Sequence, residues 1–430
     1  MIIQQYRYKF LLPALLCMLA TSLHAQTDTA FNRRKISLDN YLSLVGKQNL
    51  GYIAAQYDVS IAETGIESAK VFPDPSLSVG AYDNQQATKH LGRGVNAGLS
   101  TTLELGGKRK ARIGLAQSQA ELSKALLQDY FRNLRADATL AYYNALQEYS
   151  LYKVTYNSYT TMQQLATADS IRFKLGAIME VDARQSKLEA GNLLNSVYQS
   201  EADWKTSLVQ LNLHTGSKVL DTLLLPSGNF DELHRTFALT ALVEEAQASR
   251  ADAVAAKNTQ NVAAKNKQLV MANRKIDLGV SVGMQHSGES TNDIAPTPTY
   301  RSVNAGISIP LKLSNRYKGD VKAANFTIRQ AATQYDEVLL QIKVEVTQAY
   351  MNYQAAEKQV AQYESGLLSE AEKVLNGKIY SYKRGETSLL EVLNAQRTYN
   401  DLQQNYYQAL YNHAATLVEL ERSAGVWDLK

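Results

Sequence analysis

The chain of 430 residues contains a single cysteine, Cys17, which lies in an apolar run from Phe10 to Ala20. Basic residues precede this run and Leu-His-Ala follows it, which predicts a secretory signal peptide over residues 1–25, cleaved after Ala25. The mature chain would hold no thiol, which excludes disulfides, cysteine-based metal sites and cysteine nucleophiles. Lipidation of Cys17 is the minor alternative, because a lipoprotein cysteine usually follows a small residue.

Other features are missing as well. No later apolar run approaches the roughly 20 residues of a membrane-spanning helix. The net charge is +4 and charged residues make up 20% of the chain, which is not the footprint of a nucleic-acid-binding protein. The five histidines after residue 25 have no metal-ligand spacing, and no phosphate loop or Ser/His/Asp cluster occurs. We therefore expect an exported protein that is not an enzyme and has no cofactor, metal site or nucleic-acid partner.

The sequence repeats itself. Residues Val95–Leu105 are echoed by Val303–Leu313, a shift of 208 (303 minus 95). The segment Lys174–Gly176 is echoed by Lys383–Gly385 at a shift of 209 (383 minus 174), so one residue is inserted between the two matches. A tandem duplication of a helix-strand-strand-helix-helix unit is therefore predicted. The ranges expected for its parts are 26–219 for the first copy, 220–235 for a linker and 236–430 for the second copy.

Each copy contains two segments of alternating apolar and small polar residues. The predicted strands span 75–86, 94–106, 276–286 and 301–313. A transmembrane β-strand needs ~9–11 residues, and these segments fit that length. A half-buried soluble sheet alternates in the same way, but the export signal and the Gly, Ser and Asn of the polar face favour strands in a membrane. The residues expected to face lipid are Val95, Leu99, Leu103, Ile307, Ile309 and Leu311.

Four strands cannot close a barrel, because the smallest spanning barrels have ~8 strands and an open edge in lipid leaves backbone groups unpaired. The chain is therefore expected to oligomerise. Pro310 removes one hydrogen-bond donor and is expected to mark a bend or bulge where strand passes into helix.

Two proline-free segments, 108–173 and 316–382, predict very long helices. Each has about 66 residues, which at ~1.5 Å per residue would reach about 100 Å. Heptad spacing of their apolar residues, and of those in the helices that follow, predicts paired antiparallel coiled coils. A stripe of tyrosines from Tyr142 onward is expected to pack with hydrated hydroxyls. Shorter helices are expected at 37–71 and 236–274.

With these features the chain resembles the TolC-like outer-membrane efflux proteins, or outer membrane factors. The resemblance covers the mature chain, and Glu104–Arg109 is similar to the heavy-metal (cation) efflux branch. It implies a mainly α fold with transmembrane β: a trimeric 12-stranded β-barrel, four strands per protomer, continued by a long periplasmic α-helical barrel. The expected location is the outer membrane of a Gram-negative bacterium.

The function implied by the resemblance is that of a passive export duct. Its partners would be two copies of itself, outer-membrane lipid, a periplasmic adaptor (membrane fusion) protein and an inner-membrane pump of the resistance-nodulation-division type. The cargo would be heavy-metal cations, with drug or small-molecule efflux and type I secretion as alternatives. An exported structural coiled coil is an alternative of another class, but it does not account for the matched pairs of strands.

The resemblance also implies functional residues at the two helix hairpins. Family hairpin tips dock the adaptor, and here they are Leu175, Gly176, Arg384 and Gly385. The same glycines could simply end their helices in a left-handed conformation, and both roles are compatible.

Acids follow both tips at equal distance. Asp182 and Glu391 lie six residues after Gly176 and Gly385, where the family narrows its periplasmic aperture with acidic rings. Three-fold copies of these carboxylates would favour cations, whereas the alternative is a solvated helix face. Thr387 supplies no cation to hold such a gate closed.

A basic group, Lys108, Arg109, Lys110 and Arg112, follows the second strand of the first copy. The sequence lacks the remaining residues of a phosphate loop. An interfacial anchor at the membrane edge is therefore the favoured interpretation.

Overall fold

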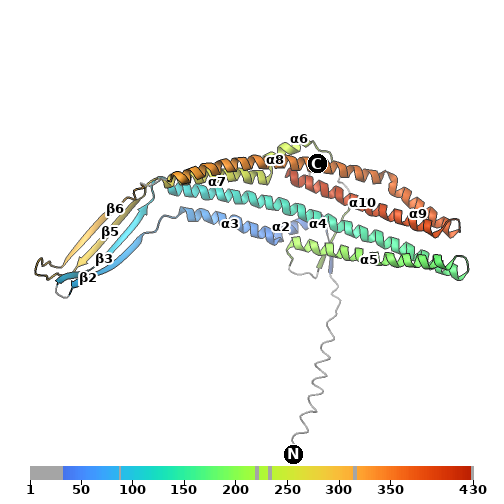
Figure 1. Ribbon diagram of the computed structural model, residues 1–430, viewed down its shortest axis with the longest axis horizontal. Helices are drawn as coiled ribbons and strands as arrows, with labels where there is room; N and C mark the ends of the chain where they lie inside the picture. Colours follow the sequence, from blue (N-terminus) through green and yellow to red (C-terminus); the bar gives the residue numbers. More distant parts are fainter. Residues whose placement is uncertain (1–31, 87–88, 218–221, 231–234, 313–316, 428–430) are drawn as a thin grey trace, which may run out of the picture. The chain divides into compact units, whose positions relative to one another are not determined.

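A computed structural model of the chain (Figure 1) describes residues 32–86, 89–217, 222–230, 235–312 and 317–427. The predicted signal peptide and Cys17 lie outside these residues. Within them, none of the helices combines the length and the hydrophobicity that crossing a bilayer requires.

The same order of elements occurs twice along the chain. The first copy consists of β1 (Asn32–Ile36), α2 (Leu38–Gln48), α3 (Leu50–Lys70), β2 (Ser76–Gln86), β3 (Lys89–Leu103), α4 (Lys108–Lys174) and α5 (Glu180–Thr215). The second consists of β4 (Thr222–Pro226), α6 (Leu239–Ser249), α7 (Ala251–Asn273), β5 (Leu278–Ser287), β6 (Tyr300–Ser308), α8 (Lys318–Gln362), a π-helix η1 (Tyr363–Leu367), α9 (Leu368–Lys383) and α10 (Leu389–Ala424).

Each copy opens with a short strand that the sequence did not predict. β1 and β4 pair in parallel, with Asn32 opposite Thr222 and Ile36 opposite Pro226. β4 lies inside the range 220–235 that was expected to be a linker only. Five residues are too few for alternation to identify a strand, and the charged Asn-Arg-Arg-Lys of β1 does not resemble one.

The opening helix of each copy is two helices, where the sequence predicted one. The breaks fall at Asn49 and Arg250, whose ψ angles of 120° and 136° are extended. The side chain of Asn49 accepts a hydrogen bond from the backbone N–H of Tyr52 at 2.9 Å, so it caps α3. Neither break contains glycine or proline, which explains why the sequence pattern passed over them.

The two long helices differ in continuity. α4 runs from Lys108 to Lys174, close to the expected range 108–173. Its counterpart, expected over 316–382, is interrupted by η1, in which Gly366 has φ +111°. The shift between the copies changes from 208 to 209 in this part of the chain. A helix accommodates one inserted residue as a single wide turn, so the insertion explains the π-helix.

The chain forms two compact units that do not follow the two copies. Of the described residues, those within 32–45 and 141–229 form one unit, and those within 46–140 and 230–427 form the other. The second unit therefore contains strands from both copies, and α2 and α4 each pass from one unit into the other.

Buried tyrosines connect helices to backbone in both units. In the first unit the Tyr142 hydroxyl donates to the Ser227 carbonyl at 2.7 Å and accepts from the Ser227 N–H at 3.0 Å. In the second, the Tyr353 hydroxyl accepts from the Arg235 N–H at 2.8 Å. Tyr142 is 2% exposed and Tyr353 1%. The expectation of hydrated hydroxyls was therefore wrong for Tyr142, because its hydroxyl satisfies backbone groups.

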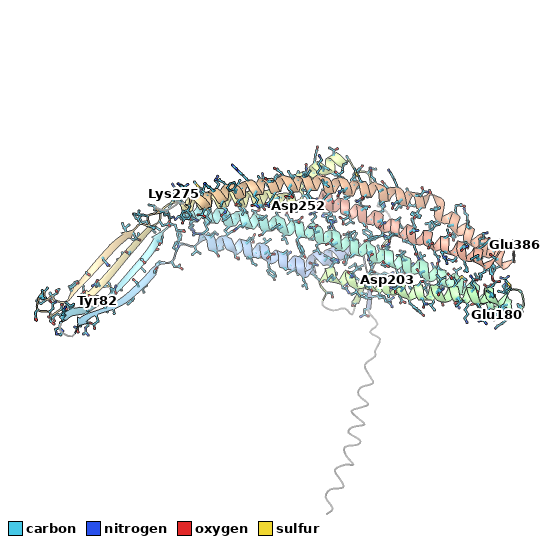
Figure 2. The ribbon with its side chains drawn as sticks, viewed as in Figure 1. Tyr82, Glu180, Asp203, Asp252, Lys275 and Glu386 are labelled. Carbon is cyan, nitrogen blue, oxygen red and sulfur yellow. The ribbon has the colours of Figure 1, made fainter. Side chains whose placement is uncertain are left out.

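A buried arginine organises the second unit. Arg250, 2% exposed, stands at the break between α6 and α7. Its guanidinium donates to the Asp252 carboxylate at 2.7 Å and to the Ser423 carbonyl at 2.9 Å, and it pairs with Glu345 at 2.7 Å. Asp252 lies in the first turn of α7 (Figure 2), Glu345 in α8 and Ser423 at the end of α10. One side chain therefore fixes three helices.

Burial alone would raise the pKa of the Asp252 carboxyl, but hydrogen bonds and attraction from Arg250 outweigh it and lower this pKa below its ordinary value. The pair therefore stabilises the fold fully above the ordinary pKa of ~3.9, and this contribution is lost as pH falls through the lowered value. At neutral pH the pair is intact.

We expect Arg250→Met to lower the free energy of unfolding by about 3 kcal/mol at pH 7, because it leaves two carboxylates without their buried partner. Thermal unfolding followed by circular dichroism measures the change, with the exposed Lys358→Met as control. The deficit should shrink as the pH is lowered below about 4, where Asp252 becomes protonated in the variant. A deficit that is the same at pH 7 and pH 3 would contradict the assigned role.

Candidate functional site

Four strands from both copies form one antiparallel sheet. Their order is β2-β3-β5-β6, and Figure 1 shows them side by side. The central contact is between β3 of the first copy and β5 of the second, with Leu99 opposite Val282 and Leu103 opposite Leu278. β2 and β6 are the two edges.

The register places apolar residues together on one face. Leu77, Leu99, Val282 and Ala305 form one row across the four strands. Other members of this face are Val79, Ala97, Met284, Val303, Val280 and Ile307. Large side chains on it are uncovered, as the exposed fractions of 76% for Val79 and 78% for Val303 indicate. An uncovered apolar face of this extent marks an interaction surface.

The opposite face carries small polar residues. Ser76, Ser100, Ser281 and Gly306 form the row next to the leucine row. Side chains on this face reach backbone of the neighbouring strand: the Ser78 hydroxyl donates to the Gly98 carbonyl at 3.2 Å. The sheet is therefore apolar on one side and hydrophilic on the other.

Four of the six residues expected to face lipid lie in strands. Val95, Leu99 and Leu103 belong to β3, and Ile307 belongs to β6. Ile309 and Leu311 lie beyond the end of β6, so their assignment to a strand was wrong.

The predicted strand ends at 106 and 313 were too late. β6 stops at Ser308 because Pro310, two residues on, has no N–H to donate. β3 stops at Leu103, shortly before Gly106 and Gly107, whose φ values of +72° and +75° are incompatible with a strand.

The two hairpin tips have the same backbone geometry. The Gly176 N–H donates to the Phe173 carbonyl at 2.8 Å, and the Gly385 N–H donates to the Tyr382 carbonyl at 3.0 Å. In both, the next residue donates to a carbonyl five residues earlier, which completes a Schellman motif. The φ values are +73° for Gly176 and +80° for Gly385. The side chain of Leu175 is 77% exposed, so this tip offers an apolar residue to solvent.

The acids that follow the tips occupy the first turns of their helices. Asp182 is half-buried near the start of α5, and Glu391 is exposed near the start of α10. Carboxylates are favourable there because the helix dipole is positive at the N-terminus.

A lysine that the sequence analysis missed forms an ion pair with Glu391. The Lys378 ammonium in α9 donates to the Glu391 carboxylate. The hydrogen bond and the charge attraction from Lys378 lower the pKa of Glu391 below its ordinary value. Thr387 itself supplies no cation, and the cation beside Glu391 is Lys378 of the facing helix.

The signal for this pair was its position about the turn. Lys378 lies seven residues before Gly385 and Glu391 six residues after it, so antiparallel helices bring them together. At the shift of 209 the first copy has Asp169 in place of Lys378 (378 minus 209). Asp169 is fully buried and pairs with Arg172 at 3.5 Å. The two tips therefore differ in charge although their backbones agree.

The basic group after β3 is divided by its contacts. The Lys108 ammonium is buried and pairs with Asp277 at 2.5 Å, and the Arg112 guanidinium pairs with Glu104 at 2.7 Å. The Arg109 guanidinium lies 4.3 Å from the centre of the Phe72 ring. Lys110 is exposed. Lys108 and Arg112 thus tie the end of the sheet to the helices. Arg109 donates to the Lys70 carbonyl at the end of α3 at 2.6 Å, which leaves Lys110 at the surface.

Among the described residues, no cluster of three or more metal-ligand side chains occurs. His413 is buried and stacks on Tyr353 with 5.2 Å between ring centres, and at the shift of 209 it corresponds to Trp204 of the first copy (413 minus 204).

Comparison with known proteins identifies the class. Residues 242–426 match the family of outer membrane efflux proteins. The cobalt-zinc-cadmium resistance protein CzcC of Cupriavidus metallidurans is 27% identical over 368 residues, which cover 84% of this chain and 84% of CzcC. The outer membrane protein TolC of Escherichia coli is 21% identical over 369 residues, which cover 82% of this chain and 74% of TolC.

Solved structures agree in fold. A crystal structure of CusC superposes with a TM-score of 0.74 at 16% identity, covering 90% of this chain and 92% of the other. The open state of the Neisseria gonorrhoeae MtrE outer membrane channel gives a TM-score of 0.72 at 15% identity, covering 90% and 89%. The fold is therefore that of the TolC-like channels. The sequence of residues 242–426 and the fold thus agree with the resemblance to the TolC-like outer-membrane efflux proteins.

Proposed function

We propose that the protein is the trimeric outer-membrane channel of a tripartite efflux system. The observation that carries this proposal is the four-stranded sheet, which has one uncovered apolar face, one small polar face and two open edges. Such a sheet is suited to lipid on one side and water on the other. It cannot exist alone in lipid, because the edge strands would leave backbone groups unpaired.

A trimer satisfies this constraint. When β6 of one protomer pairs with β2 of the next protomer, three four-stranded sheets close into a 12-stranded barrel without an edge. Uncovered apolar side chains on the helices support the same assembly. Examples are Leu188 (70% exposed), Phe326 (65%), Leu340 (63%) and Met351 (60%). Neighbouring protomers would cover these residues in a periplasmic helical barrel.

The duct is passive, and a partner pump supplies the energy. A water-facing surface of Gly, Ser and Asn offers little selectivity, so the cargo is chosen elsewhere in the system. We propose heavy-metal cations as the cargo, supported by the similarity to CzcC, whose name records resistance to cobalt, zinc and cadmium. The partners would be a periplasmic adaptor and an inner-membrane pump of the resistance-nodulation-division type.

The hairpin tips would dock the adaptor through Leu175, Gly176, Arg384 and Gly385. Support comes from the shared Schellman geometry, which presents two similar knobs, and from the exposure of Leu175. The acids Asp182 and Glu391 would line the periplasmic aperture, with Lys378 reducing the negative charge contributed by Glu391.

Charge on the apolar face of the sheet should block assembly. We expect Leu99→Arg and Ile307→Arg each to cost ~2–4 kcal/mol near the bilayer midplane. Ser100→Arg is the matched control, since its neighbours Ser76 and Ser281 are small and its face is polar. Heat-modifiable trimers in outer-membrane fractions provide the measurement. Equal trimer yields for all three variants would contradict the assignment of the faces.

Distorting a hairpin tip should abolish export while leaving trimers intact. Gly385→Val places a β-branched residue at φ +80°, which costs about 1–3 kcal/mol locally. A Cβ at Gly385 meets no other atom within 4 Å, so the effect arises from the backbone and not from a clash. Gly377→Ala in α9, where a Cβ also has open space, is the control and should leave export unchanged.

Photocrosslinkers at Leu175 and Arg384 should capture the adaptor, and their failure to do so would argue against docking at the tips.

Ion selectivity should follow the charges at the aperture. In planar bilayers, Glu391→Gln with Asp182→Asn should reduce the preference for cations, and Lys378→Gln should increase it. Because Lys378 lowers the pKa of Glu391, the carboxylate stays ionised as pH falls through its ordinary pKa of ~4.3. In Lys378→Gln, selectivity should therefore fall off at a higher pH than in the wild type. Reversal potentials that are unchanged in both variants would place the constriction elsewhere.

A further inference from the structure

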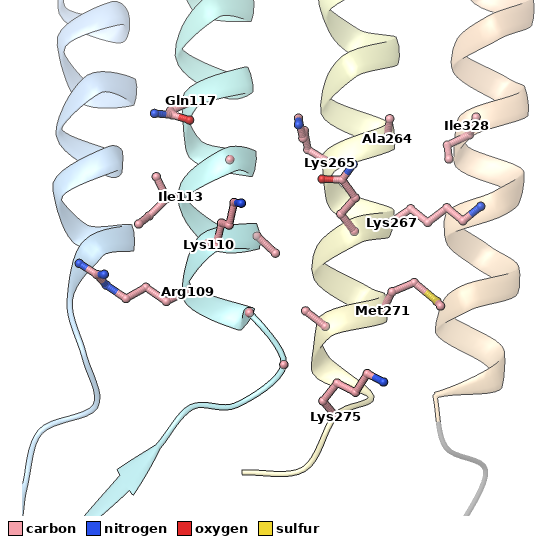
Figure 3. A pocket seen from close by; sticks show the side chains of 16 residues that line it. Arg109, Lys110, Ile113, Gln117, Ala264, Lys265, Lys267, Met271, Lys275 and Ile328 are labelled. Carbon is pink, nitrogen blue, oxygen red and sulfur yellow. The ribbon is translucent and has the colours of Figure 1, made fainter. Parts of the chain in front are cut away.

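A basic groove lies where the sheet meets the helices. It is formed by the start of α4 and the end of α7, with Ile328 of α8 at one side, and it encloses about 1020 Å³ (Figure 3). Five cations line it: Arg109, Lys110, Lys265, Lys267 and Lys275. No acidic residue occurs among the described residues that line it.

The groove is amphipathic. Besides the cations it is lined by Ile113, Met271 and Ile328, together with several alanines and glycines. Figure 3 shows Lys110 of α4 and Lys265 of α7 between these two helices, with Lys275 just beyond the end of α7. Charge attraction and apolar contact are therefore available to one ligand.

The fold keeps this charge available. Two other cations at the start of α4 are paired with acids, Lys108 with Asp277 and Arg112 with Glu104. No ion pair involves Lys110, Lys265 or Lys275 within the described part of the chain. Lys110, Lys265 and Lys275 therefore supply the unpaired positive charge of the groove, whereas the Arg109 guanidinium donates to the Lys70 carbonyl at 2.6 Å.

Close backbone approach shapes the opening. A Cβ at Gly106 would lie 2.4 Å from the side chain of Lys275, so only glycine allows the link from β3 to α4 to pass this lysine. Lys275 therefore lines the groove directly beside the link between β3 and α4.

The groove begins where the membrane sheet ends. β3 ends at Leu103, three residues before Gly106, and β5 starts at Leu278, three residues after Lys275. Leu105 and Ile276, between sheet and groove, are 43% and 44% exposed. If the sheet spans the bilayer, as the proposed function requires, the groove lies at the depth of the lipid headgroups.

We propose that the groove binds the phosphate headgroup of an anionic glycerophospholipid of the adjacent leaflet. The cations attract the phosphate, and the apolar residues accommodate the glycerol and the first methylenes. The volume fits a headgroup better than a single ion. This inference rests on the proposed function because it takes the depth of the groove from the membrane sheet.

The test is lipid binding to the purified full-length trimer, measured by native mass spectrometry with phosphatidylglycerol, phosphatidylcholine or inorganic phosphate added. We expect phosphatidylglycerol to bind the wild type more tightly than phosphatidylcholine does. Lys110→Gln with Lys265→Gln should weaken phosphatidylglycerol binding by more than tenfold, since each basic residue near anionic lipid contributes roughly fivefold. The control is Lys343→Gln with Lys358→Gln, two exposed lysines on α8, which should bind as the wild type does.

Three outcomes would overturn the proposal. The first is unchanged phosphatidylglycerol binding in the groove variant. The second is equal binding of phosphatidylcholine, which would reduce the groove to an apolar contact. The third is competition by inorganic phosphate at the concentration of the lipid, which would make it a site for free anions. Failure of the proposed function has a separate signature, namely a wild-type chain that forms no trimers in the outer membrane.

Discussion

Pairing between β3 and β5 is the interaction on which the rest of this structure depends. Ten antiparallel residue pairs, from Gly94 with Ser287 to Leu103 with Leu278, join one copy of the repeat to the other. Each copy by itself supplies only two strands to this sheet, and a two-stranded hairpin is marginally stable at best. The pairing doubles the sheet and aligns the apolar residues of both copies on one face. It also fixes where four helices start or end, because α3, α4, α7 and α8 continue from the strands.

The duplication explains which parts of the fold could be predicted from the sequence. Alternation in Val95–Leu105 and its echo identified the strands, and the absence of proline identified α4. A change of shift from 208 to 209 located an insertion in the second long helix, although not its form. The structure takes up the extra residue in η1, where Gly366 at φ +111° departs from helical geometry and kinks the helix.

The misses share a physical cause, which is that they depend on contacts distant in sequence. β1 is a strand because β4 lies beside it, 190 residues later (222 minus 32), and its own residues are polar and charged. At the end of α6, the Arg250 guanidinium forms an ion pair with Glu345 and donates a hydrogen bond to the Ser423 carbonyl. Neither partner can be identified from local periodicity. The same holds for the candidate site. The tip glycines could be predicted from the sequence, whereas the pairing of Lys378 with Glu391 became clear only when the structure placed α9 and α10 side by side.

The charge balance differs between the junction of sheet and helices and the tip of the second hairpin. At the sheet end, cations exceed acids, and the acids present are used to fix Lys108 and Arg112. At the tip of the second hairpin, a carboxylate is held ionised by a lysine on the facing helix. A bilayer surface bearing phosphates attracts the first arrangement, whereas a narrow aqueous opening is tuned by the balance of the second. The two hairpin tips share one backbone geometry, yet Asp169 of the first copy occupies the position of Lys378 in the second, so the side chains of the two copies have diverged while the backbone has not.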